Sequence, residues 1–128
     1  MSTAFNPATG LIVFRATLYG PNGSGTARFG LDTGATVTSL SPRALRAVGI
    51  NPLRDNIGTV PVITANGIIS APLITLDRLE ALGQIQTGLT VQATALPSEL
   101  QIDGLLGLDF LRVYRLVVDF RTGQITLT

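Results

Sequence analysis

One aspartate stands in a setting suited to acid–base chemistry. Asp32 directly follows the apolar segment 29–31 and is itself followed by Thr33 and Gly34. A carboxylate at the end of a buried strand is unfavourable unless hydrogen bonds stabilise it, and a sharp turn can supply backbone N–H groups and a hydroxyl for this. The triplet alone has two interpretations: a catalytic carboxylate, or an aspartate that only stabilises its own turn.

The residue types that the chain lacks narrow the possible chemistry. It has no histidine, cysteine or lysine, and its charged side chains are six aspartates, two glutamates and nine arginines. Serine–histidine and cysteine–histidine catalysis, metal sites built on histidine or cysteine, and lysine Schiff bases are therefore excluded. An enzyme of this composition has to work with carboxylates, and we expect it to use no cofactor and no metal.

A second motif lies towards the other end of the chain. Leu105-Leu106-Gly107 consists of two apolar residues and a glycine, and the segment 109–111 (Asp-Phe-Leu) follows it. Taken alone, the motif fits a buried strand that ends at a glycine turn. Combined with Asp-Thr-Gly at residues 32–34, it resembles the retropepsin-like aspartic proteases, in which the two segments cross to form the floor of the active site.

The resemblance extends over nearly the whole chain and implies a role for each matching residue. Asp32 would be the catalytic aspartate, Thr33 would join a threonine–threonine grip between subunits, and Gly34 would offer backbone to the substrate. The implied sites are catalytic (Asp32, Thr33, Gly34), substrate-binding (Ala35 and, at the flap tip, Ala65, Asn66, Gly67 and Ile68) and active-site floor (Leu105, Leu106, Gly107).

The reaction of this family needs two carboxylates, and the sequence offers one. One carboxylate activates a water that attacks a peptide carbonyl while the other, protonated, donates to the carbonyl oxygen. No other aspartate precedes a hydroxyl residue and a glycine, and Asp103-Gly104 comes nearest. We therefore expect a two-fold homodimer that hydrolyses extended peptides at apolar residues, with one Asp32 from each subunit.

Departures from the family pattern leave alternatives open. Viral members commonly carry acidic residues after the triplet and an arginine after the second motif, whereas this chain has Thr36, Val37 and Leu108 there. The flap also lacks a clear aromatic residue at its tip. A non-catalytic dimeric peptide-binding module with the same fold is one alternative, and a structural β-barrel subunit with accidental motifs is another.

Short strands separated by turn residues have to position these motifs. The resemblance and the pattern together predict an all-β fold in one domain over residues 1–128: a closed or folded-over acid-protease barrel of short antiparallel strands with one or two short helices. The expected strands cover residues 11–19, 26–31, 37–40, 57–64, 68–76, 89–95, 114–120 and 124–128. Helices are expected from Ser41-Pro42 to Gly49 and over residues 109–113.

Composition gives few indications of location or partners. The net charge is +1 and the arginines are scattered, so no nucleic-acid site is expected. Residues 56–76 carry no charge, but their prolines and the Asn66-Gly67 turn favour a β-hairpin over a membrane helix. No signal peptide is visible at the N-terminus, which favours a cytoplasmic protein or a soluble domain of a larger one. The high mean hydropathy, +0.42, suggests a buried subunit interface.

Overall fold

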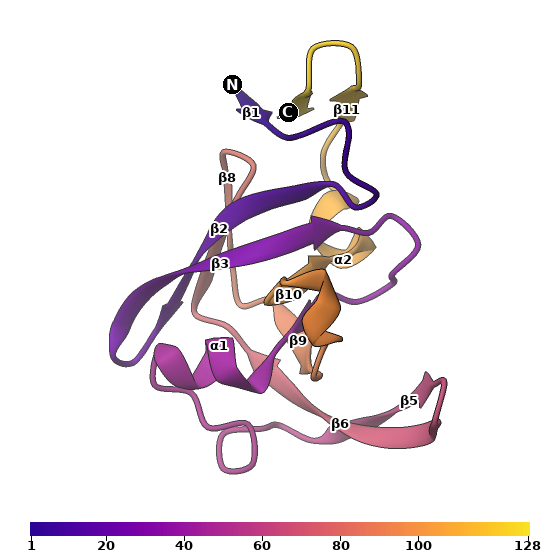
Figure 1. Ribbon diagram of the computed structural model, residues 1–128. Helices are drawn as coiled ribbons and strands as arrows, with labels where there is room; N and C mark the ends of the chain where they lie inside the picture. Colours follow the sequence, from indigo (N-terminus) through magenta and orange to yellow (C-terminus); the bar gives the residue numbers. More distant parts are fainter.

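The computed structural model describes residues 1–128 and consists of two β-sheets with two short α-helices (Figure 1). The strands are β1 (Ser2–Ala4), β2 (Val13–Gly20), β3 (Gly23–Leu31), β4 (Ser39–Leu40), β5 (Thr59–Thr64), β6 (Gly67–Thr75), β7 (Arg78–Ala81), β8 (Gln84–Thr87), β9 (Thr90–Ala93), β10 (Gly104–Leu106), β11 (Leu116–Asp119) and β12 (Gln124–Leu127). The helices are α1 (Pro42–Ala47), α2 (Leu108–Leu111) and the 3₁₀ turn η1 (Ser98–Leu100). With six and four residues, neither α-helix is long enough to cross a membrane.

The larger sheet has nine strands in the order β5-β6-β9-β4-β10-β3-β2-β7-β8. It curls into a half-barrel, and β5 and β8 remain as its two edges. The all-β prediction with short helices is therefore confirmed, whereas strand pairing does not close the barrel. Two pairs, β10 with β3 and β4 with β9, are parallel rather than antiparallel. Parallel neighbours need long crossover connections, which short-range turn signals in a sequence do not indicate.

The β2–β3 hairpin forms one wall of the core because its side chains alternate between the two faces of the sheet. Ala27 and Phe29 point inward and are buried, and Phe29 stacks on Phe14 of β2 with 6.2 Å between ring centroids. Arg28 between them is exposed. The strand therefore reaches Leu31 with one face fixed by apolar packing, and Asp32 follows directly.

Helix α1 forms where the sequence predicts it. The Ser41 hydroxyl accepts a hydrogen bond from the Ala44 N–H, Pro42 occupies the first turn, and Leu45 is fully buried. Helix α2 begins at Leu108, one residue before the predicted start at Asp109. The carboxylate of Asp109 does not cap the helix from outside, because it is engaged with a neighbouring loop, as described below.

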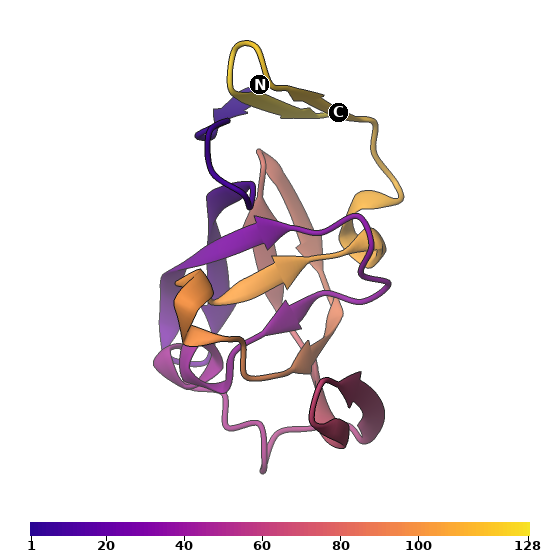
Figure 2. The same ribbon diagram turned by 45° about the vertical axis from the view of Figure 1, so that its right-hand side comes forward.

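The sequence-based prediction includes the closing β11–β12 hairpin, but it lacks the β7–β8 hairpin and strand β1. The β7–β8 hairpin turns at Leu82 and Gly83, both of which have positive φ angles, 53° and 79°. The short strand β1 pairs with β12, and β12 with β11, to make a separate three-stranded sheet from the two chain ends. Both ribbon views show this terminal sheet at one end of the molecule and the β5–β6 hairpin at the other (Figures 1 and 2).

Candidate active site

The Asp32 turn begins where β3 ends. The Asp32 N–H donates to the Leu106 carbonyl over 3.0 Å, which fixes the start of the turn to β10. The carboxylate oxygen Oδ1 accepts the Gly34 N–H at 3.0 Å, and the Asp32 carbonyl accepts the Ala35 N–H at 3.1 Å. Asp32 is half-buried, while Thr33 and Gly34 are exposed. One carboxylate oxygen is thus held by the turn, as the sequence predicted for a stabilised carboxylate.

The predicted floor lies beside this turn. Strand β10 runs parallel to β3, with Leu105 opposite Gly30 and Leu106 opposite Leu31. Gly107 then approaches the loop after Asp32 so closely that an added Cβ would lie 2.8 Å from the Ala35 carbonyl oxygen. A side chain at this position would collide with backbone, so the two segments can cross only at a glycine.

A buried polar bracket, made of Thr38 and Asp109, connects the same loop to α2. Thr38 is fully buried, and its hydroxyl donates to Asp109 Oδ1 at 2.6 Å and accepts the Gly107 N–H at 3.1 Å. The Thr38 N–H donates to Asp109 Oδ2 at 3.0 Å. Further bonds join Leu108 N–H to the Ala35 carbonyl and Asp109 N–H to the Thr36 carbonyl. Charge-assisted bonds of this kind are among the stronger ones in proteins, so they hold the loop in one shape.

This bracket is absent from the sequence-based prediction. Thr38 and Asp109 are 71 residues apart, and each has an ordinary local interpretation, one in a strand and one at a helix start. The available signal was their position next to the two motifs: Thr38 lies shortly after Asp32, and Asp109 shortly after Gly107.

The predicted flap residues lie at the tip of the β5–β6 hairpin. Ala65, Asn66, Gly67 and Ile68 are all exposed, and the Thr64 hydroxyl closes the turn by donating to the Gly67 carbonyl at 2.8 Å. No hydrogen bond joins this tip to the Asp32 turn. Neither Asp32 nor these hairpin residues line any of the hollows in the surface of the chain. No three acidic residues lie close enough together to form a metal site. One chain therefore presents a carboxylate, a floor and a hairpin without an enclosed cleft.

The sequence from residue 21 to residue 113 matches the family model described as "gag-polyprotein putative aspartyl protease". The chain belongs to this family. The matched span contains both the Asp32 turn and the floor, as well as the bracket and the β5–β6 hairpin. The terminal strands β1, β11 and β12 lie outside it.

Solved structures of other proteins have the same fold as this chain. A retropepsin-like aspartic protease from Rickettsia conorii is 24% identical, with a TM-score of 0.73 over 99% of this chain and 88% of the other. The retroviral protease-like domain of Ddi1 from Leishmania major is 14% identical, with a TM-score of 0.57 over 94% and 95% of the two chains. Simian foamy virus (mac) protease is 18% identical, with a TM-score of 0.53 over 78% and 91%. No curated protein matches by sequence. The fold is therefore retropepsin-like.

Charge around the retropepsin-like site is sparse. The single ion pair of the chain joins Arg54 and Asp55, with 2.9 Å between Nε and Oδ1, in the loop that precedes β5. The hydrogen bond from Arg54 and a second one from the Asn51 N–H hold the pKa of the exposed Asp55 carboxyl below its usual range. No salt bridge involves Asp32, so its charge is free to interact with groups that approach from outside the chain.

Proposed function

We propose that the chain is an aspartic endopeptidase that works as a homodimer, with Asp32 of each subunit forming a two-carboxylate site. The observation that carries the proposal is the Asp32 turn: a half-buried, hydrogen-bonded carboxylate that lies on a floor built by Gly107 and β10. Membership of the aspartyl protease family supports the same reaction class.

A second subunit would supply what one chain lacks. The Asp32 turn lies outside every hollow of the single chain, so an enclosed cleft requires another surface opposite it. Thr33 is exposed beside the carboxylate, where it could meet its symmetry mate. The terminal sheet exposes Val117 and Phe120, with 41% and 59% of their surface accessible, and its outer strands β1 and β11 have unpaired edges. Apolar side chains and free edges are the features that a second copy could cover.

The proposed reaction divides two roles between two equivalent carboxylates. At a separation near 3 Å, two carboxylates cannot both be ionised, so one is protonated. The ionised one takes a proton from water as the water oxygen bonds to the peptide carbonyl carbon, and the protonated one donates to the carbonyl oxygen. When the intermediate collapses, the C–N bond breaks and the leaving nitrogen takes a proton from the carboxyl that received it from water, while the other carboxylate takes a proton back from a hydroxyl of the intermediate as the C=O bond re-forms. The Gly34 N–H would hold Oδ1 of Asp32 and so fix the direction of Oδ2.

The β5–β6 hairpin supports a preference for apolar substrate residues. Ile63 and Ile68 lie opposite each other near its tip and are 84% and 72% exposed, and the adjacent Ile69 is also exposed. They are therefore not part of the core of the chain. An extended peptide lying between hairpin and floor could cover these side chains and add strand-like hydrogen bonds.

The test is cleavage of a peptide library at several pH values by the wild type and by Asp32→Asn. We expect cleavage by the wild type only, because an amide cannot act as the base. Asp77→Asn is the matched control, since Asp77 is an exposed aspartate whose side chain makes no hydrogen bond, and it should cleave like the wild type. Equal cleavage by wild type and Asp32→Asn would rule out this mechanism. A folded, inactive wild type that binds peptides would favour the non-catalytic module.

The dimer is tested by sedimentation. We expect a concentration-dependent monomer–dimer equilibrium, with specific activity falling as dilution shifts it to monomer. Activity that stays with a monomer would contradict the one-aspartate-per-subunit arrangement.

A further inference from the structure

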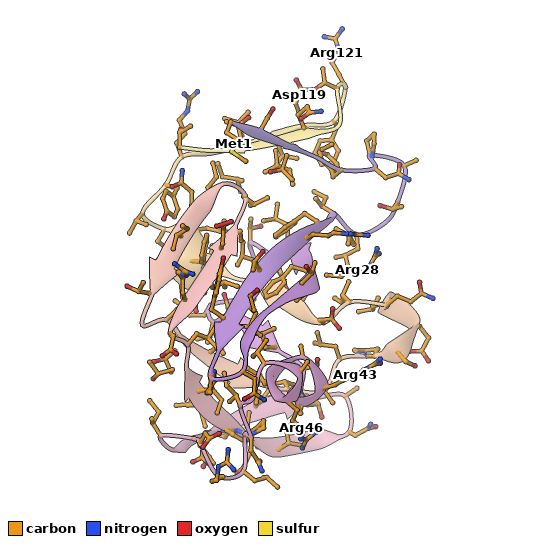
Figure 3. The ribbon with its side chains drawn as sticks, turned by 90° about the vertical axis from the view of Figure 1, so that its left-hand side faces the viewer. Met1, Arg28, Arg43, Arg46, Asp119 and Arg121 are labelled. Carbon is orange, nitrogen blue, oxygen red and sulfur yellow. The ribbon has the colours of Figure 1, made fainter.

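Four arginines lie on one side of the molecule and line hollows in its surface. Figure 3 shows Arg28, Arg43 and Arg46 following one another along this side. Arg15 extends the row, because it lies directly opposite Arg28 in the β2–β3 pair. All four side chains are exposed. Two strands and helix α1 therefore contribute to one continuous basic surface, which we call the arginine groove.

The groove contains one carboxylate, Asp103, but none of its four arginines forms a salt bridge. The one ion pair of the chain is between Arg54 and Asp55, so none of the four arginines is neutralised by a carboxylate. Like charges directly opposite each other, as in Arg15 and Arg28, destabilise a sheet. The arrangement of the four arginines therefore adds no stability to the fold. Their positive charge remains available to bind an external anion.

The surface between these arginines is hollowed. Arg28, Arg43 and Arg46 line a hollow of about 640 Å³, and Arg15 and Arg28 line a second one of about 490 Å³. The two hollows lie on either side of Arg28, which lines both. The walls combine polar groups with apolar side chains such as Leu96 and Ile102.

Arg28, at the junction, is held in place by its neighbours. Its Nε donates to the Gln101 carbonyl at 3.0 Å, and its backbone N–H donates to Asp103 Oδ2 at 2.8 Å. Asp103 is the one carboxylate that lines the hollows, and this hydrogen bond engages it. Glu99 lies next to the lining residue Ser98. The terminal nitrogens of Arg28 remain free to bind a ligand.

We propose that the arginine groove binds an acidic stretch of polypeptide. Guanidinium groups suit carboxylates because they can form two parallel hydrogen bonds, and several of them in a row suit a chain of carboxylates better than a single anion. The apolar walls would accept the side chains between the acidic residues. A nucleic acid fits less well, because the net charge of the chain is only +1 and phosphate binding relies on a larger basic surface.

The position of the groove gives it a use in substrate selection, which rests on the proposed function. Arg28 and Asp32 belong to the same chain segment, four residues apart, which corresponds to about 13 Å along a strand. A substrate with an acidic stretch beyond its apolar cleavage site could be held at both places. Tethering at one site raises the effective concentration at the other.

The test measures binding without turnover and uses the Asp32→Asn protein. A fluorescein-labelled peptide containing six glutamates interspersed with leucines is titrated at low salt, beside its lysine counterpart and a single-stranded oligonucleotide. We expect the acidic peptide to bind and the basic one not to bind. Arg15→Gln/Arg43→Gln/Arg46→Gln should weaken binding about tenfold, because each exposed pair contributes a few tenths to one kcal/mol.

A matched variant removes the same charge elsewhere. Arg54→Gln/Arg78→Gln/Arg121→Gln changes three exposed arginines outside the groove and should alter affinity less than twofold. An equal loss in both variants would overturn the proposal, as would the absence of acidic-peptide binding. Tighter binding of the oligonucleotide than of the acidic peptide would overturn the assignment to polypeptide. Since no cleavage is measured, these outcomes do not depend on whether the chain is a protease.

Discussion

The floor and the flap hairpin, two parts of the candidate active site, differ in the contacts that hold them in place. The floor is fixed by buried contacts: the Thr38–Asp109 bracket, the parallel β3–β10 pair, and the close approach of Gly107 to the Ala35 carbonyl. The β5–β6 hairpin is a two-stranded ribbon with an exposed tip, where the added Cβ of Gly67 would meet no atom within 4 Å. The Asp32 carboxylate thus lies on a base fixed by contacts between distant segments, whereas the hairpin tip that would cover substrate makes no hydrogen bond to the Asp32 turn.

This difference indicates where the molecule can tolerate change. Groups that act on a reacting bond have to be held in place, whereas a segment that admits and releases a peptide has to move. Matched substitutions in floor and flap should therefore differ in kind: floor variants should lose stability, and flap variants should lose substrate affinity.

Matched glycine substitutions should show the largest contrast. Gly107→Ala would place a Cβ 2.8 Å from one backbone atom and 3.0 Å from another, so we expect a loss of about 3 kcal/mol or more, or failure to fold. Gly67→Ala has open space but a φ of 114°, so we expect a loss of about 1–2 kcal/mol. Denaturant unfolding of both proteins checks this, and equal losses would contradict the contrast.

Matched threonine substitutions should give the next effect. Thr38→Val removes the hydroxyl between Asp109 and Gly107. It leaves the buried Gly107 N–H without an acceptor and takes one hydrogen bond from the half-buried Asp109 carboxylate, at about 2–3 kcal/mol. Thr64→Val removes one exposed bond to the Gly67 carbonyl, at less than about 1 kcal/mol. Thermal unfolding compares the two. If Thr38→Val is as stable as the wild type, the bracket is not what fixes the loop.

An isoleucine at the flap tip should affect activity rather than folding. Ile68→Ser exchanges a 72% exposed side chain, so unfolding should change by less than about 0.5 kcal/mol. On the proposed function, kcat/KM for an apolar peptide should fall about tenfold, because contact with substrate is lost. Ile85→Ser, at an exposed site on the other sheet edge, is the control and should leave kcat/KM unchanged. An equal fall in kcat/KM in both variants would show that the effect does not arise at the flap.

The smallest effect should come from the ion pair before the flap. The pKa of Asp55 is lowered in the fold, so its pairing stabilises the protein above the ordinary carboxyl pKa of 3.8 and is lost as the pH falls through the folded value. Arg54→Gln should therefore be slightly less stable than the wild type near pH 6, and the difference should be smaller near pH 3, below the ordinary carboxyl pKa. Urea unfolding at both values tests this. If the stability difference between the two proteins grew as the pH fell, the prediction would be wrong.

The sequence allowed the chemically constrained parts to be predicted. Leu-Leu-Gly carries the glycine that the crossing requires, and Ser41-Pro42 carries a cap and a fixed φ that start a helix. Such features depend on local chemistry, so a stretch of a few residues is enough to predict them. Asn66-Gly67 likewise indicated the hairpin that the structure contains.

The missed parts depend on contacts between distant segments. Leu82 adopts a left-handed conformation that leucine rarely takes, and it is 4% exposed, so tertiary burial holds it there. Strand β1 has three residues and exists because β12 lies beside it. The bracket joins two segments that lie together where β10 pairs with β3. None of these leaves a pattern in a short window of sequence.

The terminal sheet places the two ends of the polypeptide beside each other, with Ser2 opposite Thr126. A short flexible linker from Thr128 to Met1 could therefore turn the chain into a ring without disturbing its core. Cutting that ring at the exposed Pro21-Asn22 turn would give a circular permutant with the same arrangement of strands. The order in which the elements are synthesised would change. Strands β11, β12 and β1 would then follow one another in the middle of the sequence instead of lying at its two ends.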